Sequence, residues 1–190
     1  MSPEAFLEYW RRSYGEAPLV GHALRACFPR RWLRIHNLPD SKRYAETEDE
    51  RQEILRRQNR LLDELIGEGG PCELVFGYYG EEERLPEEVL VALRSLEPVV
   101  LATISLGEAD LVREFPLLKA SFPWRPKALD PILLAVADDV LETPLIVGPQ
   151  RCCTLAPYDG GVDLIVESEE LRDQLKLRYA SWLSKHPAGL

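Results

Sequence analysis

The chain lacks the residue patterns that mark the best-known catalytic and cofactor sites. It contains no G-x-S-x-G nucleophile elbow, no G-x-x-x-x-G-K-[ST] phosphate loop, no G-x-G-x-x-G turn and no H-E-x-x-H zinc motif. Its only histidines are His22, His36 and His186, which excludes a histidine-rich metal site. The sequence therefore indicates no cofactor and leaves open whether the protein is an enzyme.

Long hydrophobic runs are also absent. The longest, at 99–106 and 131–137, are far shorter than the roughly 20 residues needed to cross a bilayer. Glu4 and Glu8 occupy positions where a secretory signal needs basic residues and an apolar stretch. We therefore expect no membrane span and no secretory signal.

Cysteine is scarce and follows no metal-binding spacing. Cys27, Cys72, Cys152 and Cys153 form no C-x-x-C pair, and a disulfide between the two adjacent residues would be strained. We predict four reduced thiols, buried as small apolar side chains, in a cytoplasmic protein.

Basic residues are fewer than acidic ones. The 190-residue chain has 23 Lys and Arg against 32 Asp and Glu, a formal net charge of −9. Phosphate contacts require a basic surface, so this balance argues against general nucleic-acid binding. An acidic surface instead attracts basic partner proteins.

The chain does contain clear helix signals. The best is the T-x-x-E capping box of Thr47 and Glu50, followed by an apolar stripe that ends at Gly67. Serine caps, prolines in first turns and apolar spacing predict further helices at 3–14, 19–27, 86–97, 130–138 and 168–182.

Strand signals alternate with these helices. Alternating or branched apolar residues predict strands at 32–37, 72–79, 99–105, 118–124, 145–147, 152–155 and 162–166. We expect the strand at 99–105 to be buried and the strand at 118–124, which contains Pro123, to lie at a sheet edge. The turns between the last strands are too short for parallel crossovers. We predict a single α+β domain over 1–190, with a mostly antiparallel sheet packed by helices.

One segment departs from the acidic average. Between Arg30 and Arg43 there are five basic residues and one acidic residue, and Arg34 and His36 share a strand face. A candidate anion-binding site follows, in which arginines hold the ligand and the histidine carries a proton. Its residues are Arg34, His36, Lys42, Arg43 and, at the rim, Tyr44. Alternatively, acidic residues at 46–53 neutralise this cluster with internal salt bridges.

A second candidate lies in the sequence Y-D-G-G-V-D at 158–163. Asp159 and Asp163 offer two carboxylates that could hold a divalent cation, although the further acidic ligands of an EF-hand loop are missing. The Asp-Gly pair is also what a left-handed hairpin turn requires, with no metal.

These two segments and a third, in the middle of the chain, carry a resemblance to a known family. The chain resembles a family of uncharacterised bacterial proteins in three blocks. These are the R-x-H-x-L-P-x-S-K-R-Y pattern at 34–44, the middle block around Trp124 and Asp130, and the Y-D-G-G-x-D ending with Trp182. Because that family has no known function, the resemblance implies no catalytic residue. In size, acidity and mixed fold the chain is also loosely similar to bacterial toxin-immunity proteins.

Three functional hypotheses follow. The first is a non-enzymatic binding protein of immunity or regulatory type with a protein partner. The second is an enzyme or ligand-binding domain for a small anionic substrate at the Arg34 segment. The third is a homodimer formed through Trp10, Trp32 or the strand at 118–124.

Overall fold

The computed structural model describes residues 1–77, 85–106, 113–142 and 144–184. Its α-helices are α1 (Pro3–Tyr14), α2 (Gly21–Cys27), α3 (Glu48–Leu65), α4 (Glu87–Ser95), α5 (Asp130–Ala137) and α6 (Glu169–Arg178). Its strands are β1 (Trp32–His36), β2 (Pro71–Gly77), β3 (Val99–Leu106), β4 (Arg113–Pro123), β5 (Leu145–Gly148), β6 (Cys153–Tyr158) and β7 (Gly161–Ile165). Short 3₁₀ helices are η1 (Pro39–Ser41), η3 (Pro149–Arg151) and η4 (Ala180–Trp182).

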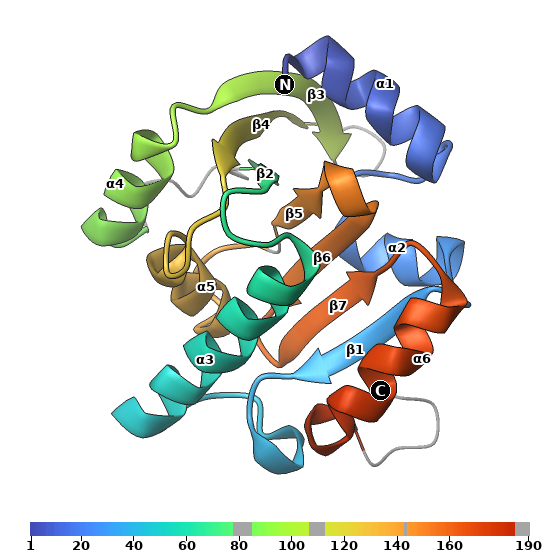
Figure 1. Ribbon diagram of the computed structural model, residues 1–190. Helices are drawn as coiled ribbons and strands as arrows, with labels where there is room; N and C mark the ends of the chain where they lie inside the picture. The colour runs from blue at the N-terminus through green and yellow to red at the C-terminus, as the bar shows by residue number, and fades with distance from the viewer. Residues whose placement is uncertain (78–84, 107–112, 143, 185–190) are drawn as a thin grey trace.

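All seven strands form one antiparallel sheet in the order β1-β7-β6-β5-β2-β4-β3 (Figure 1). The predicted α+β class with a mostly antiparallel sheet is therefore confirmed. The predicted helices and strands are present with ends shifted by a few residues, and positions 78 and 79 of one predicted strand lie outside the described residues. No helix in the described part of the chain is long and apolar enough to span a membrane.

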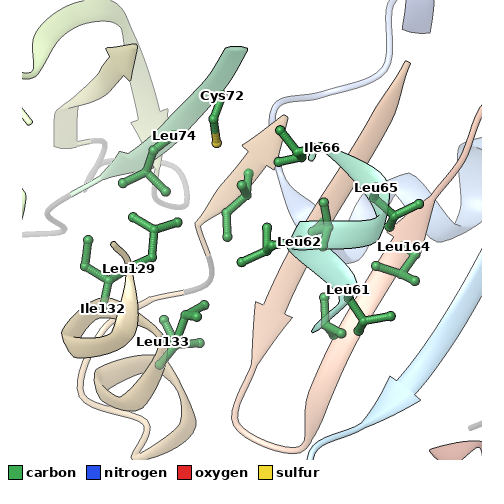
Figure 2. Close-up of a cluster of buried hydrophobic side chains, with 14 of the residues drawn as sticks. Leu61, Leu62, Leu65, Ile66, Cys72, Leu74, Leu129, Ile132, Leu133 and Leu164 are labelled. Carbon is green, nitrogen blue, oxygen red and sulfur yellow. The ribbon is translucent and has the colours of Figure 1, made fainter. Parts of the chain in front are cut away.

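Helices cover both faces of the sheet. On one face, Leu61, Leu62 and Leu65 of α3 pack with side chains of α5, β2 and β7 in the largest apolar cluster (Figure 2). On the other face, α1 and α2 contribute Phe6, Trp10, Tyr14 and Leu24 to a second apolar cluster. Side chains of β1, β6 and β7 therefore alternate between these two layers.

The signals at the ends of α3 act nearly as predicted. The Thr47 hydroxyl accepts a hydrogen bond from the backbone N–H of Glu50 at 3.3 Å. The Glu50 carboxylate accepts from the N–H of Glu46 at 2.7 Å, one residue before the position expected in a capping box. Gly67, with φ of 83°, takes the left-handed conformation after the helix end.

The positions of β3 and β4 in the sheet correct two predictions. The strand at 99–105 is an edge strand whose Val99 and Val100 are 48% and 60% exposed, so the expectation of a buried strand was wrong. The strand at 118–124 belongs to β4, which lies between β2 and β3 and is not an edge strand of the sheet, although residues 120–123 pair with β2 alone. Pro123 is tolerated because it pairs with Pro71 at the end of the ladder.

This arrangement limits the surfaces suggested for a homodimer. β4 has β2 on one side and β3 on the other, but its pairing with β3 stops at Lys119, so only residues 120–123 lack a second neighbouring strand. The Trp10 side chain is buried beneath α1, and its Nε1 donates to the carbonyl of Ala17 at 2.8 Å. Trp32 is half-buried and stays a candidate contact.

The four thiols are free, as predicted, but they are not all buried. Cys72 and Cys153 are buried, and burial raises the pKa of Cys153 to about 12. Cys27 is exposed and Cys152 is half-buried, so the expectation of burial was wrong for these two.

A buried ion pair lies beneath α1 that the sequence patterns did not indicate. Lys119 of β4 and Glu73 of β2 are 1% and 2% exposed, and they are joined by a bond of 2.6 Å. Ser121 and the backbone carbonyl of Met1 also accept hydrogen bonds from the Lys119 ammonium. The pair therefore ties the start of the chain to the centre of the sheet.

Candidate functional site

The two predicted sites meet at one end of the sheet. β1 and β7 pair so that Arg34 lies directly opposite Asp163 and His36 opposite Gly161. The Arg34 guanidinium donates two hydrogen bonds to the Asp163 carboxylate, at 2.7 and 2.9 Å. Residues 129 positions apart thus form a bidentate pair, and the Asp163 carboxylate holds the Arg34 pKa above its usual value.

Tyr158, at the end of β6, lies at the centre of this group. The Arg34 guanidinium carbon is 4.8 Å from the centre of its ring, a cation–π distance. Burial raises the pKa of Tyr158 to about 12. We use the name Tyr158 cluster for a set of seven residues: Arg34, His36, Arg43, Tyr44, Tyr158, Asp159 and Asp163.

The turn after β1 adds two of these members. Asp40 and Ser41 in η1 both have left-handed backbone angles, with φ of 54° and 58°. This turn directs the chain back so that Arg43 and Tyr44 both donate to Oδ2 of Asp159, at 2.8 Å for the Tyr44 hydroxyl. Burial opposes ionisation of Asp159, but these donors outweigh it and hold its pKa below the usual value.

His36 is the least satisfied member of the cluster. The residue is 8% exposed, and its ring atom Nε2 has no hydrogen-bond partner. Burial lowers the His36 pKa, and the charge of Arg34 lowers it further, although a hydrogen bond with the Gly160 backbone acts in the opposite direction. The imidazole is therefore neutral at pH 7, with one unpartnered nitrogen.

Lys42 does not join the cluster. Its ammonium binds the Glu50 carboxylate at 2.7 Å and that of Glu46 at 3.1 Å. Internal neutralisation by the segment at 46–53 therefore applies to Lys42 alone. Arg34 and Arg43 are instead paired with aspartates of the second predicted site. An external anion must displace the Asp163 carboxylate to form a two-bond pair with Arg34, whereas Arg43 is 64% exposed and binds Asp159 through Nε.

The two glycines of this segment are explained by close approach. A Cβ on Gly161 would lie 2.2 Å from the Ile35 carbonyl oxygen, and one on Gly160 would lie 2.9 Å from the Tyr158 ring. Neither Asp159 nor Gly160 has a left-handed φ, so the expectation of a left-handed turn was wrong. In the described part of the chain no three His, Cys, Asp or Glu side chains gather as metal ligands.

Sequence reasoning missed the residues that hold the turn in place. The Asn37 amide donates to the backbone carbonyl of Asp159 at 3.3 Å and accepts from buried Gln58 of α3 at 2.8 Å. Arg57 of α3, itself buried, donates to the His36 carbonyl at 2.9 Å. The signal that could have indicated this role is the presence of two polar residues, Arg57 and Gln58, among the apolar residues of α3.

Two hollows lie away from the Tyr158 cluster, on either side of Asp130. The α3 groove has a volume of about 430 Å³ and is lined by Gln52, Leu55, Arg56, Asn59, Arg60, Asp63, Pro126, Lys127 and Asp130. The α4–α5 pocket has a volume of about 240 Å³ and is lined by Arg51, Pro86, Glu88, Val89, Asp130, Pro131, Leu134, Ala135, Asp138 and Val140. No motif in the sequence pointed to either.

Glu88 and Asp138 line the α4–α5 pocket, and further exposed carboxylates lie on the chain segments next to its lining residues Arg51 and Asp138. We call them the acidic end: Glu46, Glu48, Asp49, Glu88, Asp138 and Asp139. Arg51 joins two of its parts, with bonds of 2.8 Å to Asp138 and 4.0 Å to Glu48. Tyr44 and Val140, which lie beside these acids, are 47% and 42% exposed.

The fold and these contacts define a single α+β domain in which the segments at 34–44 and 158–163 meet in space. The chain belongs to the family that carries the domain of unknown function DUF3885, matched over residues 20–187. The predicted membership in a family without a known function is thereby confirmed. No curated protein matches the chain, and no solved structure does.

Proposed function

We propose that the chain is a binding domain, not an enzyme, and that it recognises a basic partner protein through its acidic end. The observation that carries the proposal is the set of six exposed carboxylates in the acidic end, where Glu88 and Asp138 line a pocket with exposed Val140 and Asp139 lies near exposed Tyr44. Protein interfaces commonly combine an aromatic or aliphatic anchor with a charged rim. An immunity or regulatory role is consistent with such a surface.

The bases of this region leave the carboxylates in excess. Lys42, Arg43 and Arg51 each bind a carboxylate of this chain. Three bases face six exposed acids and the buried Asp159, so the local field is negative. Such a field speeds the approach of a basic partner, and added salt weakens the effect.

The proposal is tested by retention of partners on immobilised chain at low and high salt. The variant E46Q/E48Q/D49N removes three charges from the acidic end, and E167Q/E170Q/D173N removes three charges from the segment leading into α6 and from α6 itself. We expect wild type and the α6 variant to retain the same basic protein at low salt, and the acidic-end variant to lose it.

The matched variants make the result decisive. Both remove carboxylates from the first turns of a helix, so circular dichroism should show the same small effect on folding. Equal retention by both variants contradicts the proposal, and so does retention that is unchanged by salt.

A second candidate function is favoured by one observation, the unpartnered Nε2 of His36. A small ligand at the Tyr158 cluster can donate a hydrogen bond to this atom, and an anionic group can bind Arg34 only by exchanging with Asp163. The Asp163→Asn variant tests this function: it should bind inorganic phosphate more tightly than wild type. Failure to do so removes the support for an anion site there.

A further inference from the structure

The α4–α5 pocket has an apolar wall and a polar rim. Val89 of α4 packs opposite Leu134 and Ala135 of α5, and Pro86, Pro131 and Val140 complete the wall. Glu88, Asp130 and Asp138 supply carboxylates, and Arg51 supplies the only cation among the lining residues that the structure describes. Three acids against one base give the lining a negative charge.

The pocket is the size of a side chain. Its volume of about 240 Å³ falls below the roughly 300–1,000 Å³ typical of sites for metabolites and cofactors. A single long side chain therefore fits it better than a complete small molecule.

The contacts within the rim show which carboxylate is available at the mouth. Arg51 donates to both oxygens of Asp138, at 2.9 and 2.8 Å. Asp130 accepts from the Asn59 amide at 2.7 Å. Glu88 lies in the first turn of α4 and is exposed, so its carboxylate can reach an incoming cation.

We infer that the α4–α5 pocket receives an arginine side chain of the basic partner, an inference that rests on the proposed function. The aliphatic stem of the arginine packs against Val89, Leu134 and Val140. Its guanidinium reaches Glu88 and the outer edge of Asp138. Arginine suits the pocket better than lysine because its guanidinium is less strongly hydrated and pairs with carboxylates through two bonds. Arginine is also enriched among interface anchors.

The test uses a defined probe, N-acetyl-arginine N-methylamide, titrated into the ¹⁵N-labelled full chain and followed by NMR. We expect saturable shifts of the backbone amides of Val89, Leu134, Ala135 and Val140. The neutral citrulline analogue should bind at least about tenfold more weakly, because it lacks the charge that strengthens hydrogen bonds to a carboxylate. The lysine analogue should also bind more weakly.

Two neighbouring residues provide matched variants. Glu88→Gln should weaken binding of the arginine probe by about threefold or more, whereas Glu87→Gln, one residue away and outside the pocket lining, should change it less. Both side chains are exposed, so neither change should unfold the chain.

The possible outcomes separate the two proposals. Absence of saturable shifts, equal binding of citrulline, or equal effects of the two variants overturns the arginine pocket. If partner retention still depends on the acidic end, the proposed function survives that result. If the probe binds as expected but partner retention does not depend on the acidic end, the proposed function is contradicted and the arginine pocket is supported.

Discussion

Arg34 and Asp163 face each other across the β1–β7 ladder and share two hydrogen bonds of 2.7 and 2.9 Å. Along the described chain, one residue comes from the first strand and the other from the last, although the two strands are neighbours in the sheet. The pair joins the segments at 34–44 and 158–163, and its carboxylate occupies the guanidinium that the sequence offered as an anion binder.

Loss of Arg34 should destabilise the fold. In Arg34→Met the carboxylate of Asp163, 8% exposed, is left without its partner, which costs about 3 kcal/mol of the free energy of unfolding. Urea denaturation measures this cost. The double variant R34M/D163L should recover part of it; a double variant no more stable than R34M would contradict this account.

Removing one partner of the buried Lys119–Glu73 pair beneath α1 should also destabilise the fold. Lys119→Met leaves the buried Glu73 carboxylate with the N-terminal ammonium at 3.1 Å and the Ser121 hydroxyl at 2.6 Å as its partners, and should lower the free energy of unfolding by about 1–3 kcal/mol. K119M/E73L should restore most of the stability, as judged by thermal and urea unfolding. Equal stability of K119M and wild type would show that the pair is not formed.

Acid should weaken the fold through His36. Because the His36 pKa is lowered from 6.5 in the folded chain, its neutral form contributes stability above that value, which is lost as pH falls through the folded-state pKa. We expect Tm to fall between pH 7.5 and 5 by more in wild type than in His36→Gln. If Tm changed with pH to the same extent in wild type and in His36→Gln, His36 would not be a source of the acid sensitivity.

Substitutions of the two adjacent glycines should differ in severity. In Gly161→Ala the new Cβ meets the backbone oxygen of Ile35, which cannot move without distorting β1. In Gly160→Ala it meets the Tyr158 ring, which can rotate. We expect a loss of about 3 kcal/mol for the first and about 1 kcal/mol for the second, within the range for overpacked sites. Urea midpoints measure both, and the reverse order would refute the explanation.

Thiol reactivity should divide the cysteines into two classes. Exposed Cys27 should react with Ellman's reagent in the native protein, whereas buried Cys72 and Cys153, whose pKa values are raised by burial, should react only after unfolding. Counting thiols with and without denaturant checks this. Native reaction of all four would contradict the burial of these two.

Local signals in the sequence predicted local structure well. Thr47 and Gly67 mark the ends of α3 because capping depends on residues three or four positions apart. Pro123 led to the wrong prediction of an edge strand. Proline restricts a strand only where its missing N–H would be used in pairing, and β4 ends at this residue.

The candidate site was predictable only in part. Both segments of the Tyr158 cluster were identified, but their pairing depends on the β1–β7 register, for which a short sequence pattern gives no information. The α4–α5 pocket had no signal either, because its wall consists of ordinary apolar residues from elements far apart in the chain.

The β1–β7 pairing also bears on how the protein is made. While a ribosome is still adding residues before 160, β1 has no strand to join, and Arg34 and Trp32 face water or a chaperone. Helices α1 to α5 and the β3–β4 pair can form earlier from nearer contacts. The end of the sheet that holds the Tyr158 cluster is therefore assembled last during synthesis, and a nascent chain stalled before Asp163 lacks it entirely.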